Sequence, residues 1–213
     1  MRLAIIGVGT VGGGLAAAAV GAGHDVVVSA TDPARAQERA ATSGATAASG
    51  NVDAVQQSDV VVLAVPHAAV AGIVTELGAA LDGKVVVDAT NPLNDSYSDL
   101  TTSGVSAAEQ LQQQVPQARV VKALNTVFAS RYAAPTEGGV PVDALLAGDD
   151  ERAKTTVARL VASLGLRPVD AGALRMARTL EELAFLNISL NATHGWTWQS
   201  AFQLVGPQAP AAS

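Results

Sequence analysis

The sequence predicts an α/β fold: a Rossmann-like, doubly wound, mostly parallel sheet followed by a helical C-terminal cap. The first observation is that the apolar run 2–6 passes into a glycine-rich turn, Gly7–Gly12, and then into an alanine-rich helical pattern. The second is the run 59–65, which is apolar almost throughout, as a parallel strand buried on both faces must be. The third is the helical pattern of residues 177–204, which closes the chain.

The remaining elements follow from apolar runs, helical spacing and turn residues. We expect strands over residues 2–6, 25–29, 46–47, 59–65, 84–88, 119–124, 142–148 and 166–170. We expect helices over 10–22, 33–43, 52–57, 69–81, 106–115, 149–164 and 177–204. Pro168 restricts the last strand to a sheet edge, and residues 94–103 and 136–141 are expected to be loops. The expected organisation is one domain over 1–205, capped by helix from about residue 177, with a disordered tail over 206–213.

The glycine turn indicates dinucleotide binding. Gly7 permits a tight turn, Gly9 lets the backbone approach a pyrophosphate, and Gly12 lets the following helix lie close to the strand. The amino terminus of that helix favours an anion without any basic side chain. A ligand-free glycine-rich turn is the alternative, but the complete strand–turn–helix context favours a nucleotide.

The end of the second strand, where cofactor choice is made, carries mixed signals. Asp32 lies near the spacing of a carboxylate that binds the ribose of NAD, but it directly precedes Pro33, which predicts a helix N-cap. Ser29, Thr31 and Arg35 together can hold the 2′-phosphate of NADP. The alternative for Arg35 is a solvated surface charge.

Composition excludes several function classes. The formal net charge is −6 and we find no cluster of Lys and Arg, which argues against nucleic acid or a membrane surface as partner. No cysteine is present, which removes disulfides and thiolate chemistry and fits a reducing cytosol; we expect no metal site. Aromatic residues are 3% of the chain, too few for stacking a flavin on several rings. The amino terminus lacks a signal-peptide pattern and no apolar run approaches the roughly 20 residues of a membrane span, so we expect a cytoplasmic protein.

Candidate catalytic and binding residues follow the predicted strands, where ligands of doubly wound sheets lie. His67 follows the strand 59–65 and either takes part in acid–base chemistry or lines the cleft by packing. Asn91, stiffened by Pro92, either faces the nicotinamide or forms a plain Asn-Pro turn. Asn125 belongs to a polar pair at the end of the strand 119–124, and Lys122 within that strand is either a site residue or a solvated lysine.

A series of motifs resembles the NADPH-dependent reductases of the deazaflavin coenzyme F420. They are Gly7–Gly12, Leu63–Pro66, Asp88–Pro92, Val120–Thr126, Ala147–Asp150 and Leu164–Gly172, and the resemblance covers about residues 1–190. The same domain is similar to the cytosolic reductase portion of membrane ferric reductases.

The resemblance implies direct hydride transfer between nicotinamide C4 and deazaflavin C5. It implies NADP(H) as the favoured cofactor, with NAD(H) possible and coenzyme F420 as co-substrate, and it demands no acid–base dyad. By matching position, Thr10 and Val11 are implied to touch the pyrophosphate. Pro66, His67 and Val70 are implied to flank the adenosine and nicotinamide path, and Asn91, Asn125, Thr126 and Val127 to border the nicotinamide. The complete predicted cofactor-binding set is Gly7, Val8, Gly9, Thr10, Val11, Gly12, Ser29, Ala30, Thr31, Arg35, Ala64, Val65, Pro66, His67, Val70, Asn91, Pro92, Asn125, Thr126 and Val127.

Two positions depart from the family pattern. Ala30-Thr31 stands where these reductases commonly have Ser-Arg, which removes the arginine expected to clamp the 2′-phosphate. His67 stands where a tryptophan is usual, which changes the shape and polarity of the cleft wall.

Two other functions fit the same sequence. One is an NAD(P)H-dependent reductase of a small carbonyl or imine, for which His67, Lys122 or Tyr132 would supply a proton. The other is a non-catalytic dinucleotide sensor that reports binding through its C-terminal helix. That final region also holds Trp196 and Trp198, and we expect it to pack on the domain or form a homodimer.

Overall fold

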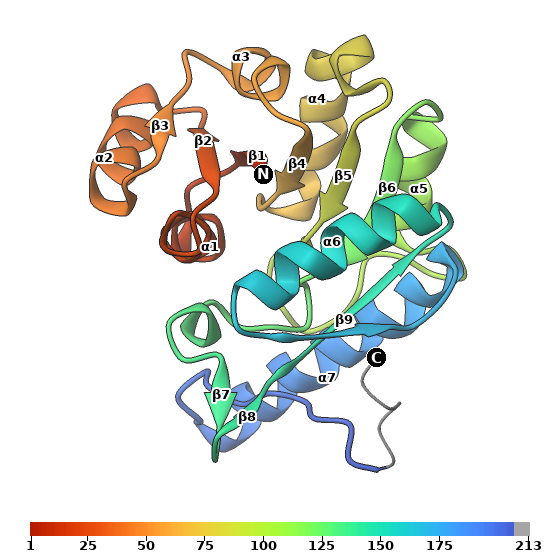
Figure 1. The fold of residues 1–213 in the computed structure, drawn as a ribbon. Coiled ribbons are helices and arrows are strands. Elements are labelled where there is room, and N and C mark those ends of the chain that lie inside the picture. Colours follow the sequence, from red (N-terminus) through yellow and green to blue (C-terminus); the bar gives the residue numbers. More distant parts are fainter. Residues whose placement is uncertain (207–213) are drawn as a thin grey trace, which may run out of the picture.

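Eight strands form one sheet in the order β3-β2-β1-β4-β5-β6-β9-β10, in a computed structural model that describes residues 1–206 (Figure 1). The expected tail over 206–213 therefore lies, beyond Gly206, outside the described residues. The strands are β1 (Arg2–Ile6), β2 (Asp25–Ser29), β3 (Thr46–Ala47), β4 (Val60–Leu63), β5 (Val85–Asp88), β6 (Arg119–Ala123), β9 (Asp143–Gly148) and β10 (Arg167–Asp170). The predicted mostly parallel sheet is confirmed. The six neighbouring strands β3-β2-β1-β4-β5-β6 are parallel, β9 is antiparallel to β6, and β10 is parallel to β9.

Helices cover both faces of this sheet because alternate side chains of each strand point to opposite faces. Leu3 and Ile5 pack in one core with α1, α2 and α6, whereas Ala4 and Ile6 pack in the other with α3, α4 and α5. The helices are α1 (Thr10–Gly21), α2 (Pro33–Ser43), α3 (Asn51–Gln56), α4 (His67–Leu77), α5 (Ala107–Gln114), α6 (Glu151–Ser163) and α7 (Ala177–His194), with 3-10 turns η1 (Gly78–Leu81), η2 (Ala129–Tyr132) and η3 (Leu174–Met176). Within residues 1–206, no helix combines the length and apolar character needed to cross a membrane.

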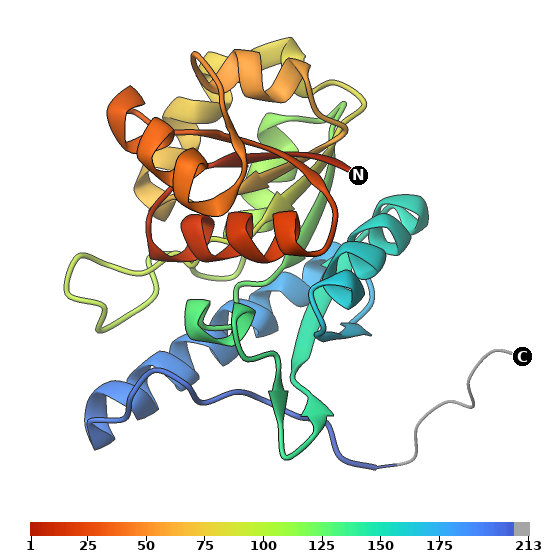
Figure 2. The same cartoon turned by 60° about the vertical axis from the view of Figure 1, so that its left-hand side comes forward.

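The expectation that the last helix reaches residue 204 is wrong. Helix α7 ends at His194 because Gly195 adopts the left-handed conformation, with φ 64°. The chain then runs back across the molecule, away from the protruding end of α7, as Figure 2 shows. Asp143 on β9 donates its N–H to Phe202 O, and the Asn191 side chain accepts the N–H of Trp198. We call residues 196–206 the C-terminal strap.

Residues 136–141 form a small hairpin, where a plain loop was expected. Its strands are β7 (Thr136–Glu137) and β8 (Val140–Pro141). Gly138 and Gly139 both have positive φ, 57° and 82°, which a tight two-residue hairpin turn requires. The other expected loop, 94–103, is confirmed and is closed at its base by an isolated bridge between Leu93 and Leu100.

Candidate functional site

The glycine turn forms a backbone cradle between β1 and α1. A Cβ on Gly7 would lie 2.4 Å from Ala64 O, and one on Gly12 would lie 1.9 Å from Gly7 O, so both positions must be glycine. A Cβ on Gly9 would meet nothing within 4 Å, so the space beside it is open. Gly9 is also the N-cap of α1 and makes no side-chain cap hydrogen bond. The open space and the N–H groups of the first turn fit a diphosphate.

A cleft of about 580 Å³ extends from this cradle between the β2–α2 connection and α4. This volume lies in the range of small-molecule sites. Of the predicted cofactor-binding set, the cleft lining includes Gly7, Val8, Gly9, Ala30, Thr31, Arg35, Ala64, Val65 and Pro66. The other lining residues are Ile6, Asp32, Asn51, Ala69, Gly72, Ile73 and Glu76. Residues from the ends of β1, β2 and β4 therefore share one cleft.

The β2 end of the cleft shows the contacts of two residues that bear on cofactor choice, Asp32 and Ser29. Asp32 accepts a hydrogen bond from Ala34 N at 3.0 Å, so its predicted role as the N-cap of α2 is confirmed. Ser29 is buried and donates its hydroxyl to Asn51 Oδ1 at 2.8 Å. The groups that remain for a 2′-phosphate on this wall are the exposed side chains of Thr31 and Arg35.

At the carboxyl ends of β5 and β6, the predicted site residues Asn91 and Asn125 are hydrogen-bonded to each other. Asn91 Nδ2 donates to Asn125 O at 2.9 Å, and Asn125 Nδ2 donates to Asn91 Oδ1 at 3.0 Å and to Leu180 O at 3.0 Å. The residue before Asn125 is Leu124, buried and at φ 65°, a conformation that costs a non-glycine residue energy. Tertiary contacts therefore hold this turn in one geometry.

Several buried polar atoms at this edge lack a hydrogen-bond partner among residues 1–206. They are Thr90 Oγ1, Asn125 Oδ1, Thr126 Oγ1 and, at the first residue of α4, His67 Nδ1. Two further unpaired atoms, Ser58 Oγ and Tyr132 OH, lie away from this edge, before β4 and beneath α1. Buried polar atoms are nearly always paired, so the group that follows β4, β5 and β6 is suited to a polar ligand such as a carboxamide.

Lys122 is fully buried, so the solvated alternative for this residue is wrong. Its Nζ lies 3.0 Å from Asp88 Oδ2, 2.9 Å from Glu181 Oε1 and 2.7 Å from Thr90 O. These contacts use all three N–H donors of the ammonium group and leave none for a substrate. Glu181 also accepts the N–H of Ala107 at 3.1 Å, at the start of α5. The Lys122 cluster thus joins β5, β6, α5 and α7.

Tyr132 is also buried. Burial raises the pKa of its phenol, and its ring packs beneath α1, 3.4 Å from the position a Cβ would take on Gly14. A buried phenol with a raised pKa is a poor proton donor to a ligand in the cleft.

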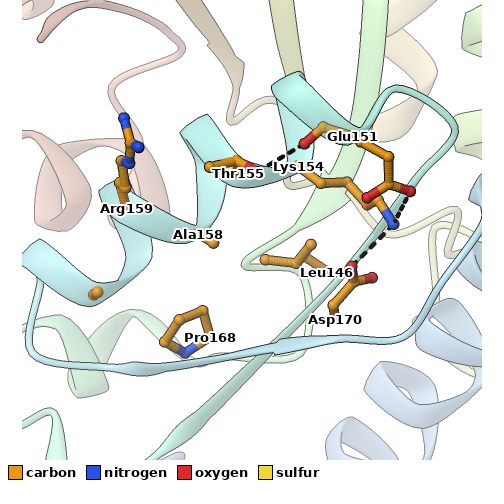
Figure 3. A pocket seen from close by; sticks show the side chains of 9 residues that line it. Leu146, Glu151, Lys154, Thr155, Ala158, Arg159, Pro168 and Asp170 are labelled. Carbon is orange, nitrogen blue, oxygen red and sulfur yellow. Dashed lines mark hydrogen bonds and ion pairs between the residues drawn. The ribbon is translucent and has the colours of Figure 1, made fainter. Parts of the chain in front are cut away.

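A second cavity, of about 400 Å³, lies between α6 and β10 (Figure 3). Its buried ammonium, Lys154, is paired with Asp170 and Glu151, each at 2.9 Å. Among the described residues that line it, none belongs to the predicted site. We therefore take the cleft at the glycine cradle as the candidate site.

Asn51 and Glu76 both line the cleft but were not predicted from the sequence. Ala69, Ile73 and Glu76 lie on one face of α4, and this spacing after Pro66 was the available signal. No comparable signal marks Asn51.

Within residues 1–206, no cluster of three or more His, Cys, Asp or Glu could hold a metal ion.

The fold and the glycine cradle are those of an NAD(P)-dependent oxidoreductase of the Rossmann class. A family model described as "NADP oxidoreductase coenzyme F420-dependent" matches residues 2–92. The F420-dependent NADP reductase of Methanothermobacter marburgensis is 31% identical and is aligned over 90% of this chain and 92% of its own length. The chain belongs to the F420-dependent NADP oxidoreductase family.

Two further proteins are similar to this chain. Metalloreductase STEAP3 of Rattus norvegicus is 32% identical over 85% of this chain, which spans only 36% of that protein. A crystal structure of a protein from Arthrobacter sp. FB24, assigned as an F420-dependent NADP reductase, superposes with a TM-score of 0.85. It is 31% identical, and the match covers 93% of this chain and 97% of that one. The resemblance to both groups inferred from the motifs is thus confirmed.

Proposed function

We propose that this protein transfers a hydride between NADP(H) and the deazaflavin coenzyme F420. The observation that carries the proposal is the continuity of one sheet edge, from the open glycine cradle at β1 to the Asn91–Asn125 pair at β5 and β6. The full-length similarity to a reductase named for F420 and NADP supports the choice of both substrates.

In this proposal the residues of the chain bind the nucleotide and orient its nicotinamide ring. The N–H groups at the start of α1 hold the diphosphate, and Thr31 and Arg35 hold the 2′-phosphate. The bound nucleotide supplies or accepts the hydride at C4 of its nicotinamide. Asn91, Asn125 and Thr126 border that ring, and the unpaired oxygens of the last two accept hydrogen bonds from its carboxamide. Hydride transfer requires no proton donor, in agreement with the buried state of Lys122.

The experiment is anaerobic mixing of the purified protein with NADPH and oxidised F420, followed by the visible absorbance of the deazaflavin. The proposal predicts catalytic bleaching with NADPH and slower bleaching with NADH. Absence of bleaching with either nucleotide, when titration shows that both bind, rejects F420 as the substrate.

A reductase of small imines or carbonyls is the second candidate, and one observation favours it. His67 is half-buried at the start of α4, directly after the cleft residue Pro66, and its Nδ1 has no hydrogen-bond partner among the described residues, which makes this imidazole the candidate proton donor. The other two candidate donors are unsuitable, because Lys122 is fully bonded and Tyr132 is buried. Reduction of an imine that His67→Ala abolishes, without F420 turnover by the unmodified protein, would favour this candidate.

We further propose a cytoplasmic homodimer that forms through α7 and the C-terminal strap. The support is the apolar surface of this region, where Leu186 is 49%, Trp196 47% and Trp198 46% exposed. Sedimentation velocity should show a dimer that Leu186→Glu converts to a monomer. A monomer at all concentrations would contradict the dimer but not the reaction.

A further inference from the structure

We propose that Glu76, held in place by Asn51, recognises the 6-amino group of the adenine base and selects adenine over other purines. This inference rests on the proposed binding of a dinucleotide in the cleft at the glycine cradle. It concerns the far end of that cleft, which the hydride-transfer proposal does not use.

The direction of the cleft places the base along α4. The cradle at Gly7 and Gly9 holds the diphosphate at one end, so the ribose and then the base lie farther out. Along α4, Ala69, Ile73 and Glu76 face the cleft at successive turns. Glu76 follows Ala69 by seven positions, a rise of about 10 Å along the helix axis. Glu76 therefore lies at the outer end of the cleft, beyond the apolar side chains that would cover the base.

Gly72 leaves room for the base between these residues. It lies inside α4, where glycine is less favourable than alanine. It lines the cleft, and a Cβ at this position would meet nothing within 4 Å. The helix is thus open toward the cleft at the level where a flat ring would lie against Ala69 and Ile73.

A chain of hydrogen bonds orients the Glu76 carboxylate. Buried Ser29 donates to Asn51 Oδ1 at 2.8 Å, and Asn51 Nδ2 donates to Glu76 Oε2 at 2.8 Å. These bonds connect β2, α3 and α4 around the outer wall. In the described part of the chain, no hydrogen bond engages Glu76 Oε1, which leaves one oriented acceptor at the cleft.

The chemistry of that acceptor matches adenine. An ionised carboxylate only accepts hydrogen bonds, and adenine presents an amino donor at position 6. Hypoxanthine presents an oxygen there, which would face the carboxylate without a proton between them. A 2′-phosphate beside Glu76 would be repelled, whereas Arg35 on the β2–α2 wall offers it a positive charge. The adenine edge is therefore the part of the nucleotide that suits Glu76.

The test measures binding of ADP, inosine 5′-diphosphate and 2′,5′-ADP by calorimetry. The variants are Glu76→Gln and, as a matched control on exposed α2, Glu38→Gln. We expect the unmodified protein and the control to bind ADP about tenfold more tightly than inosine diphosphate. Glu76→Gln should reduce that preference to less than about threefold, because a glutamine amide can donate to the oxygen of hypoxanthine.

Three outcomes overturn the inference. They are an unchanged base preference in Glu76→Gln, a selective gain in affinity for 2′,5′-ADP over ADP, and failure of the unmodified protein to bind ADP. The last would also reject the proposed nucleotide site, whereas failure to reduce F420 leaves the base preference unaffected.

A second variant checks the position of the base without changing a polar group. Gly72→Leu should weaken binding of ADP and inosine diphosphate equally, by about tenfold or more, with helix content unchanged by circular dichroism. Normal ADP binding by a folded Gly72→Leu protein would show that the base lies elsewhere and would overturn the inference.

Discussion

Asn91 and Asn125 exchange hydrogen bonds across the ends of β5 and β6. The Asn91 side chain donates to the Asn125 carbonyl oxygen at 2.9 Å, and the Asn125 side chain donates to Asn91 Oδ1 at 3.0 Å. The Asn125 amide nitrogen also donates to Leu180 O on α7. The proposed border of the nicotinamide is thus attached to the C-terminal helix, and its geometry depends on elements far apart in sequence.

Asn125→Ala should impair turnover more than nucleotide binding. The substitution removes both donated bonds, which lets the turn after β6 shift while the glycine cradle stays intact. We expect kcat for F420 reduction to fall roughly ten- to a hundredfold, because small displacements of reacting groups slow transfer strongly. Titration with NADP⁺ should show a much smaller change in Kd, because the substitution removes one proposed contact to the carboxamide and leaves the cradle for the diphosphate. Gln113→Ala on exposed α5 is the control, and an unchanged kcat in Asn125→Ala would refute the positioning role.

Lys122→Met should be strongly destabilising. It leaves the carboxylates of Asp88 and Glu181 buried without their cation, which costs about 3–5 kcal/mol of unfolding free energy. Urea denaturation measures the loss. The comparison is Arg2→Met, which breaks the exposed pair with Asp59 and should cost far less, because water screens that pair. Equal losses in the two variants would show that the buried cluster is not a major source of stability.

Arg35→Ala should shift cofactor preference toward NAD(H). Arg35 is the cation among the described residues that line the β2–α2 wall, beside Ala30 and Thr31. We expect affinity for 2′,5′-ADP to fall about tenfold and that for ADP to stay constant, because only the former carries the 2′-phosphate. Calorimetry on Arg152→Ala, an exposed residue of α6, provides the control. An equal loss for both ligands would place Arg35 elsewhere on the nucleotide.

Glu109 should contribute stability that disappears in acid. Hydrogen bonds from Arg178 and from the Ser106 N–H lower the pKa of Glu109 from 4.5 to about 2. A lowered folded-state pKa stabilises the fold above the unfolded value, so the contribution is complete above about pH 4.5 and is lost as the pH falls toward 2. Urea unfolding of Glu109→Gln should show a deficit of about 1 kcal/mol at neutral pH that shrinks between pH 4.5 and 3. A deficit independent of pH would contradict this assignment.

Most of the fold was predictable because its strongest signals are local. The strand 60–63 requires apolar residues on both faces, and the glycine turn requires small residues at fixed spacing. The predicted C-terminal end of α7 was wrong because a single left-handed residue, Gly195, ends this helix, although its apolar pattern continues into the C-terminal strap. Periodicity alone does not distinguish a continued helix from an extended chain that packs back on the domain.

Site residues were predictable from the sequence only where they directly follow a single strand. Contacts between residues of different strands and helices were not predictable. The partners of Lys122 come from β5 and α7, so no sequence spacing brings Asp88 and Glu181 to it. Asn51 and Glu76 likewise meet only when α3 and α4 pack side by side. Such long-range polar contacts appear once the fold is known.

Isotope transfer tests the proposed reaction most directly. NADPH that carries deuterium at both C4 positions is mixed anaerobically with the protein and oxidised F420 in ordinary water, and the reduced deazaflavin is analysed by mass spectrometry and NMR. Direct hydride transfer predicts one deuterium at C5 of each reduced F420 molecule. Reduced F420 that carries two protiums and no deuterium at C5, or no reduction by a protein that binds both cofactors, would contradict it.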